Sequence, residues 1–115
     1  MVKASGYLPR RGDVVWLDFK PQTGREQDGR RPAVVLSNSL YNKKVGLVIF
    51  CPITSKIKNY PFEVPLPENV DVQGVILADQ IKNLDWKHRN AKFIGKIDDQ
   101  IMEKVLSLFG KIIEL

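Results

Sequence analysis

The sequence predicts a mainly β fold, an all-β barrel or curled sheet of about five to seven short strands with one helix packed against it. Short runs rich in β-branched, aliphatic and aromatic residues recur along the chain, and segments with Gly, Pro, Asn or Asp separate them. Near the C-terminus the apolar residues instead recur every three or four positions, which indicates a helix. The length of 115 residues is typical of one domain, so we expect a single domain over residues 1–115.

Two strands joined by a long polar loop are expected in the first third of the chain. Residues 1–11 form an irregular basic arm, and β-branched and aromatic residues then favour a strand over about 13–20. Pro21 ends this strand because proline cannot donate to a sheet. Residues 21–30 follow as a loop dense in charged and amide side chains, and a short apolar strand over 31–37 comes after it.

The middle of the chain predicts a turn and a series of further strands. Residues 38–42 are expected to form a turn or a single helical turn, and 54–59 a second polar loop. The other expected strands are short and mostly apolar or alternating, and they cover residues 46–52, 62–66, 74–78, 79–85 and 91–97. The run 46–52 is nearly all apolar, which is typical of a central strand, whereas Pro65 indicates an edge strand.

A helix is expected at the end of the chain, over residues 101–113. Its apolar residues share a spacing of three and four, and they are Ile101, Met102, Val105, Leu106, Leu108, Phe109, Ile112 and Ile113. Asp98 or Asp99 is the expected N-cap, because a carboxylate there accepts from the free N–H groups of the first turn. The apolar face is wide enough to serve the core, a dimer contact or both.

Composition and charge restrict the class of protein. The chain has a net charge of +5 and a pI near 9.4, which permits nucleic-acid binding but is also typical of a solvated basic surface. No apolar run approaches the roughly 18 residues of a membrane span, and the N-terminus lacks the apolar stretch of a signal peptide. Cys51 is the only cysteine and lies in an apolar run, so we expect a buried thiol, no internal disulfide and a cytoplasmic protein.

Metal and cofactor chemistry are not expected. The chain has a single Cys and a single His, His88, and no ligand pair has the spacing of a zinc site. A Gly-rich phosphate loop is also lacking. The basic segment 82–96, with Trp86 and Phe93, could bind RNA by charge and stacking. We interpret it instead as a solvated basic face over a core tryptophan.

Residues 24–32 are the segment in which RNA chemistry could be placed. Transesterification needs a base for the 2′-hydroxyl, a cation for the crowded phosphorane and help for the leaving 5′-oxygen. Glu26 could be the base, and Arg31 could hold the phosphorane oxygens through its planar guanidinium. Thr54 could donate a hydroxyl hydrogen bond to the same phosphate. From spacing alone, a surface loop of ion pairs is the better interpretation of these residues.

A resemblance to a known family changes this interpretation. The segments that carry it are GDVVWLDF at 12–19, GREQDG at 24–29, RPAVVLS at 31–37, CPIT at 51–54, YPFEV at 60–64 and GVILADQ at 74–80. Together they resemble, in the same order, the MazF/PemK (Kid) toxins, and the resemblance extends over roughly residues 11–113.

The resemblance implies both a fold and a function. The implied fold is an SH3-like barrel with a C-terminal helix, also found in CcdB, assembled as a homodimer. The implied function is that of a sequence-specific, metal-independent endoribonuclease toxin. It would cut single-stranded RNA, including mRNA, to leave a 2′,3′-cyclic phosphate and a 5′-hydroxyl, and so inhibit translation and growth. A cognate antitoxin protein would neutralise it by laying an extended segment over the active groove.

The resemblance also implies roles for particular side chains. The expected catalytic residues are Arg31, Thr54 and Glu26, and the expected RNA-binding residues are Arg25, Gln27, Lys56, Asp79 and Gln80. Some family members have a histidine at position 25 with a role in proton transfer. Arg25 does not readily deprotonate, so in this chain it can only bind or stabilise charge.

Two alternative functions stay open at this point. The toxin CcdB, which shares the implied fold, poisons DNA gyrase and depends on a C-terminal end that carries a tryptophan, whereas this chain ends KIIEL. A non-catalytic barrel would bind RNA and leave it intact.

Overall fold

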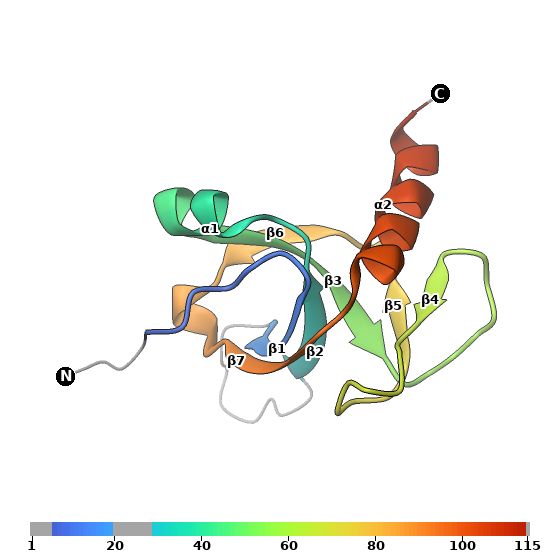
Figure 1. Cartoon of the computed structure of the whole chain (residues 1–115), viewed down its shortest axis with the longest axis horizontal. Helices are drawn as coiled ribbons and strands as arrows, with labels where there is room; N and C mark the ends of the chain where they lie inside the picture. Colours follow the sequence, from blue (N-terminus) through green and yellow to red (C-terminus); the bar gives the residue numbers. More distant parts are fainter. Residues whose placement is uncertain (1–5, 20–28, 115) are drawn as a thin grey trace.

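A strongly curled antiparallel sheet carries a helix at the C-terminal end of the chain (Figure 1). The computed structural model describes residues 6–19 and 29–114. Its strands are β1 (Asp13–Asp18), β2 (Arg30–Val35), β3 (Leu47–Thr54), β4 (Glu63–Pro65), β5 (Val75–Leu77), β6 (Lys82–Asp85) and β7 (Lys92–Lys96). Its helices are α1 (Ser39–Val45), the short 3₁₀ turn η2 (Lys87–Arg89) and α2 (Asp99–Ile113). The mainly β fold with a C-terminal helix, predicted from the sequence, is confirmed.

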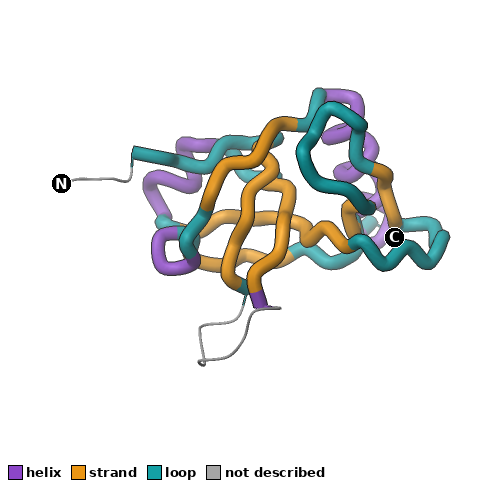
Figure 2. The backbone as a smooth tube through the Cα atoms, turned by 90° about the horizontal axis from the view of Figure 1, so that it is seen from below, coloured by secondary structure: helices purple, strands orange, loops and turns teal. Residues whose placement is uncertain are grey.

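The central strand of the sheet is β3, as its apolar sequence predicted. The strands are arranged in the order β4-β5-β3-β2-β1-β7, and β6 also pairs with β3. Along one edge of β3, the first half pairs with β6 through Phe50 and Lys82, and the last two residues pair with β5 through Thr54 and Val75. Because one strand is shared by two partners in succession, the sheet bends around it, and Figure 2 shows this curvature from below.

Apolar side chains are buried on both faces of the sheet. Successive residues of a strand point to opposite faces, so Val14 joins one buried cluster and Val15 joins the other. The first cluster also contains Met102 and Val105 of α2. The second is covered in part by Trp86, which is half-buried. Burial of each such aliphatic side chain contributes about 1.5–3 kcal/mol, and the two clusters together hold the curled sheet.

Both α-helices are ended by residues that suit their caps. Asn38 accepts from the backbone N–H of Tyr41 at 2.9 Å, and Gly46 closes α1 with φ at +80°. The expected single helical turn over 38–42 is therefore too short, because α1 continues to Val45. At α2, the Asp98 carboxylate accepts from the N–H of Ile101 at 3.0 Å, so Asp98 is the N-cap.

Residues 6–12, which precede β1, have no regular secondary structure but are held by buried polar groups. The Asp13 carboxylate, 2% exposed, accepts from the Tyr7 hydroxyl at 2.6 Å and lies 3.0 Å from the Lys96 ammonium. Burial and the bond to Asp13 raise the pKa of Tyr7. Asn42 of α1, fully buried, donates to the carbonyl of Pro9 at 2.8 Å. These contacts fix residues 6–10 against the sheet.

The expected strand over 79–85 is wrong in its first half. The backbone N–H of Gln80 donates to the carbonyl of Leu77 at 3.1 Å, which makes a tight turn directly after β5. Extended pairing begins again only at Lys82, where β6 meets the first half of β3. The alternation of side chains along 79–85 thus spans a turn and a strand.

The expectations about membranes and the cysteine can be compared with the described residues. No helix among them is long and apolar enough to cross a bilayer. Cys51 lies buried in β3, and burial raises the pKa of its thiol to about 12. The thiol is therefore protonated at neutral pH and is a packing group, as predicted.

Candidate active site

Three neighbouring strands, β1, β2 and β3, and two loops surround a hollow of about 510 Å³, called here the clamp hollow. Its lining residues are Trp16, Arg31, Pro32, Ile53, Thr54, Ser55, Lys56, Val72 and Gln73. The sheet brings Arg31, near the start of β2, together with Thr54, at the end of β3, and Lys56 follows directly. Three of the sequence-predicted site residues therefore share one hollow. Among the described residues, its lining contains two cations and no carboxylate, so this part of the hollow favours an anionic ligand.

The Thr54 side chain is oriented by its own turn. Its hydroxyl oxygen accepts from the backbone N–H of Lys56 at 3.1 Å. A hydroxyl that accepts one bond still has its proton to donate to a ligand. Thr54 is therefore placed to donate a hydrogen bond into the clamp hollow, and Arg31, which is exposed, can add a planar array of N–H donors.

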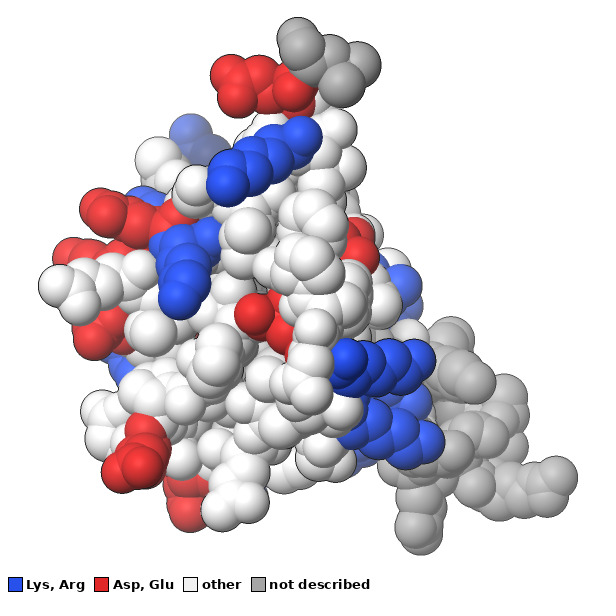
Figure 3. Space-filling view, turned by 90° about the vertical axis from the view of Figure 1, so that its right-hand side faces the viewer, with Lys and Arg blue, Asp and Glu red and all other residues white. Residues whose placement is uncertain are grey.

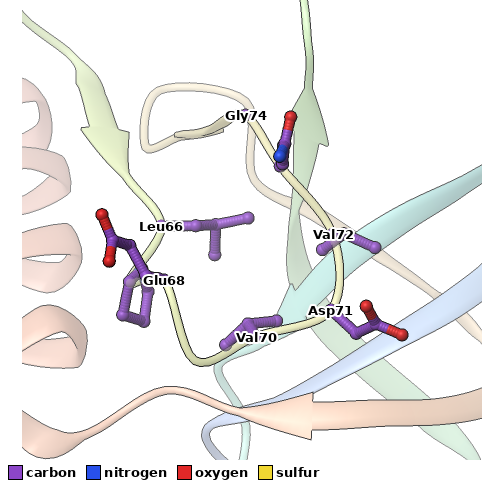
Figure 4. A pocket seen from close by; sticks show the side chains of 8 residues that line it. Leu66, Glu68, Val70, Asp71, Val72 and Gly74 are labelled. Atoms are coloured by element: carbon purple, nitrogen blue, oxygen red, sulfur yellow. The ribbon is translucent and has the colours of Figure 1, made fainter.

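The loop from β4 to β5 forms one wall of the clamp hollow through Val72 and Gln73. Figure 4 shows this loop, with Leu66 turned into its interior and Glu68 and Asp71 on its outer side. The loop returns to the sheet at Gly74, where φ is +136°.

Gly74 allows this wall to approach the backbone of Thr54. A Cβ at position 74 would lie only 2.3 Å from the Thr54 carbonyl oxygen. The missing side chain thus lets the loop pack directly against the residue expected to donate to phosphate.

A network of polar contacts holds together the end of β1 and the start of β2, where the loop between these strands begins and ends. Asp18 lies opposite Arg30 in the sheet and forms an ion pair with it at 2.8 Å. The same carboxylate accepts from the Asn90 side chain at 2.7 Å. Arg89 donates to the carbonyls of Asp18 and Phe19 at 3.1 and 2.6 Å. The ends of β1 and β2, which lead to Arg31, are thereby tied to η2.

The basic segment 82–96 is mainly structural. Trp86 donates from its indole N–H to the carbonyl of Asn42 at 3.0 Å and packs on the second core cluster. His88 is strongly exposed and lies beside Asp85. Together with the internal role of Arg89, these contacts support the interpretation of a solvated face over a core tryptophan, although Phe93 remains 49% exposed.

Five further predicted site residues are not among the described lining of the clamp hollow. Arg25, Glu26 and Gln27 fall outside the described residues. Asp79 and Gln80 occupy the turn after β5 and do not line the clamp hollow. The Tyr60 hydroxyl donates to the Asp79 carboxylate at 2.6 Å, and this bond, with burial and the negative charge of Asp79, raises the pKa of Tyr60 to about 12.

Sequence reasoning does not identify six members of the lining as site residues, namely Trp16, Pro32, Ile53, Ser55, Val72 and Gln73. The sequence marks Trp16 only as a strand residue, and its pairing opposite Pro32 is what places it beside Arg31. The glycine after Gln73 indicates a turn or a close backbone contact at this point of the sequence. It points to Gln73 as a site residue only once Gly74 is known to pack on Thr54. No group of three His, Cys, Asp or Glu side chains within the described part of the chain could hold a metal ion.

Charge is unevenly distributed on the face that carries the C-terminal helix. Figure 3 shows acidic side chains concentrated on the left and lower side of this face, and a group of basic side chains to its right. An anionic polymer would therefore meet attraction and repulsion on different parts of one face.

The chain is similar to a known family and to its characterised members. The family model for the PemK-like, MazF-like toxin of type II toxin-antitoxin system matches residues 10–113. The endoribonuclease toxin MazF of Escherichia coli K12 is 44% identical over 101 residues, covering 88% of this chain and 90% of that protein. The endoribonuclease EndoA of Bacillus subtilis is 34% identical, covering 85% of this chain and 88% of that protein.

Solved structures are similar over nearly the whole chain. A crystal structure of MazF from Deinococcus radiodurans has a TM-score of 0.85 and 45% identity, covering 95% of this chain and 99% of that chain. A crystal structure of MazE-MazF from the same organism has a TM-score of 0.83 and 40% identity, covering 95% and 98%.

Proposed function

Because the chain belongs to the family of PemK-like, MazF-like toxins of type II toxin-antitoxin systems, we propose that the clamp hollow is the site at which this endoribonuclease toxin cuts RNA. The observation that carries the proposal is the meeting of Arg31, Thr54 and Lys56 in one hollow, where the described lining contributes cations and a hydroxyl. Arg31 comes from β2, whereas Thr54 and Lys56 come from the end of β3 and the loop after it, so the fold brings the arginine to the other two. Such a set of donors is suited to a phosphodiester and to the extra negative charge of its transition state.

The proposed reaction is an internal transesterification of single-stranded RNA. The 2′-oxygen attacks the adjacent phosphorus, a new O2′–P bond forms, and the bond from phosphorus to the 5′-oxygen breaks. The 2′-hydroxyl proton passes to a base, and the leaving 5′-oxygen gains a proton. Arg31 holds the phosphorane oxygens and Thr54 donates its hydroxyl hydrogen bond to them. The products are a 2′,3′-cyclic phosphate and a 5′-hydroxyl.

Glu26 is the proposed base, with Arg25 and Gln27 binding the RNA beside it. The support for these roles is the family resemblance and the position of the segment, which connects β1 to β2 close in sequence to Arg31. Lys56 is the proposed contact to a neighbouring phosphate. Asp79 and Gln80 are proposed to contact RNA from the turn after β5.

Metal independence is part of the proposal. Its support is the composition of the chain, which has one His and one Cys and lacks ligand spacing. The nucleophile is then the 2′-hydroxyl of the substrate itself.

The proposed partners are a cognate antitoxin and a second copy of the chain. A MazE-MazF structure is among the similar solved structures, and two cations in the clamp hollow suit an acidic antitoxin segment that competes with RNA. The end of α2 exposes Ile112 and Ile113, at 42% and 66%, which supports a homodimer. We further propose that residues 1–115 form a single domain that acts in the cytoplasm.

The experiment that tests the proposed function compares two RNA substrates and analyses their ends. Cleavage of RNA should persist in excess EDTA. An RNA with deoxyribose only at the cut position should bind and remain intact, and the upstream fragment of normal RNA should carry a cyclic phosphate by mass. Cutting of the deoxy-substituted RNA, or dependence on an added divalent ion, would overturn the mechanism. Binding without any cutting would instead indicate a non-catalytic barrel.

A further inference from the structure

The hydroxyl of Tyr60 is hydrogen-bonded to Asp79, a residue that the proposed function assigns to RNA contact. The Tyr60 hydroxyl donates to Oδ1 of Asp79 at 2.6 Å. Gln80 follows Asp79 in the same turn after β5. The Tyr60 hydroxyl is therefore bonded directly to the acidic member of the proposed RNA-contacting pair.

The sheet register explains why these residues meet. Glu63 of β4 lies opposite Leu77 of β5, and the ladder continues one step further through the bond from the Ala78 N–H to the Phe62 carbonyl, at 2.9 Å. Counting on from this pair puts the turn before β4, with Tyr60, beside the turn after β5, with Asp79. The contact is thus set by strand pairing and does not depend on a chance meeting of surface side chains.

Tyr60 also lines a second hollow, which adjoins the clamp hollow. This Tyr60 hollow, of about 690 Å³, is lined in part by Ile57, Tyr60 and Gly74. The two hollows adjoin along the chain, since Lys56 lines the first and Ile57 the second, and Gln73 lines the first and Gly74 the second. Ile57 is 55% exposed, so the Tyr60 hollow offers apolar surface for a base. Its lining also includes Glu63 and Lys104, and Asp79 lies outside the lining of both hollows and reaches the Tyr60 hollow through its bond to Tyr60.

We infer that Tyr60 is a positioning residue that holds the Asp79 carboxylate in the orientation from which Asp79 reads a base of bound RNA. The inference rests on the proposed function, in which Asp79 contacts RNA. It adds a residue that acts through Asp79 and that determines specificity, while Arg31 and Thr54 act on the phosphate.

The physical reason lies in the freedom of an exposed carboxylate. Without a partner, the Asp79 side chain would rotate among several rotamers, and ordering it would oppose RNA binding. The bond from Tyr60 engages Oδ1 and leaves Oδ2 as the acceptor for an N–H donor. Adenine, cytosine and guanine each carry an exocyclic amino group on a base edge, whereas uracil offers only its ring N3–H as a donor. A carboxylate fixed in position to accept from an amino group thus favours such a base over uracil.

The same bond adds little to folding. It lies at the surface, where water competes for both partners and the net gain in stability is small. Because the pKa of Tyr60 is raised to about 12, the hydroxyl keeps its proton throughout the pH range in which RNA is stable. The hydroxyl can therefore donate to Asp79 during catalysis, and its bond affects orientation more than stability.

The test compares Tyr60→Phe with a matched control, Tyr7→Phe. Tyr7 donates to Asp13 at the same distance of 2.6 Å, but Asp13 is 2% exposed and lies at the start of β1. The substrate is the RNA that the wild type cuts best, identified by sequencing fragment ends, together with variants in which one base is changed to uracil.

We expect Tyr60→Phe to keep the wild-type Tm. Its kcat/KM on the best RNA should fall about tenfold, mainly through KM, as for loss of one hydrogen bond to a charged group. At one position, the ratio of its kcat/KM on the best RNA to its kcat/KM on the uracil-substituted RNA should fall by a similar factor. Tyr7→Phe should lower Tm by several degrees and leave the preference unchanged.

A second comparison separates positioning from direct contact. In an Asp79→Ala background, adding Tyr60→Phe should cause no further loss, because Tyr60 acts through Asp79. Independent losses that multiply in the double variant would overturn the inference, as would a Tyr60→Phe preference within twofold of wild type. If the wild type leaves all RNA intact, the proposed function fails, and the inference fails with it. Wild-type cutting with an unaffected Tyr60→Phe would refute the inference alone.

Discussion

The close approach of Gly74 to Thr54 makes the sharpest prediction for the clamp hollow. In Gly74→Ala the new Cβ would lie 2.3 Å from the Thr54 carbonyl oxygen and 2.8 Å from its carbonyl carbon. Real Cβ atoms do not approach such atoms closer than 3.0 Å, so the two backbones must separate by at least 0.7 Å, the difference between 3.0 and 2.3 Å. In addition, φ at residue 74 is +136°, a value that alanine adopts only under strain.

The expected loss of stability follows from these two contributions. Strained φ costs on the order of 1–3 kcal/mol, and overpacking against a rigid neighbour costs about 1–3 kcal/mol more. The sum of about 2–6 kcal/mol is a large part of the 5–15 kcal/mol typical of a folded domain. At about 4 °C per kcal/mol for a chain of this size, Tm should fall by roughly 8–24 °C.

Two other glycines supply matched controls for this substitution. Gly46 has φ at +80°, but a Cβ added there would meet no atom within 4 Å, so Gly46→Ala tests strain without the clash. Gly110 lies in α2 with open space around it, and Gly110→Ala should stabilise the helix by up to about 1 kcal/mol. From highest to lowest Tm, the expected order is Gly110→Ala, wild type, Gly46→Ala and Gly74→Ala.

The effect on cleavage should be larger than the effect on stability alone. The separation of backbones moves Thr54, and a misplacement of about 1 Å in a catalytic group can cost about 100-fold in rate. Thermal unfolding by circular dichroism gives Tm, and single-turnover cleavage at 15 °C, where every variant is folded, gives the rate. A Gly74→Ala protein with Tm within 2 °C of Gly46→Ala, or one that cuts as fast as wild type, would refute this reasoning.

Three further substitutions test the clamp, the hairpin base and the buried polar group of α1. Arg31→Ala should slow single-turnover cleavage by about 100- to 1000-fold in a protein that stays folded, and Arg31→Lys should recover little, because a point charge lacks the planar fork; rapid cleavage by the alanine variant would exclude Arg31 as the clamp. The bond from Arg30 holds the pKa of Asp18 below its ordinary value of 3.8, so this stabilisation is present above pH 3.8 and is lost as the pH falls through the lowered value. Asp18→Asn should therefore flatten the fall in Tm between pH 5 and 2, and an identical acid limb would contradict the contribution of Asp18. Asn42→Ala should lower the free energy of unfolding in urea by about 1–3 kcal/mol for each buried polar group left without a partner, starting with the Ser37 hydroxyl that donates to the Asn42 side chain; an unchanged midpoint would show that these bonds do not stabilise the fold.

Most of the fold could be predicted from the period of its apolar residues. The run 46–52 predicted the central strand. In the sheet, β3 has partners along both edges, and its side chains are buried on both faces. The length of α1 could also have been predicted, since Asn38 and Gly46 are standard cap residues that bracket the helix. The turn at 79–80 could not, because its side chains continue the alternation of a strand. The turn arises because β5 and β6 both pair with β3, at different positions along it, so the chain must turn between the two strands.

The candidate site shows where local pattern stops being informative, because Arg30 and Arg31 are adjacent and chemically identical. In the sheet, Arg30 faces Asp18 and also donates to the Asn90 carbonyl at 3.0 Å, so it closes the base of the hairpin. Arg31 is one residue further along β2 and lines the clamp hollow with Thr54. The division of roles depends on which strand pairs with which residue, since a shift of one position in β2 would exchange the two side chains. The assignment of the clamp to Arg31 thus depends on the register of β2. The ion pair of Arg30 with Asp18 supports that register, just as the position of Arg31 in the clamp hollow does.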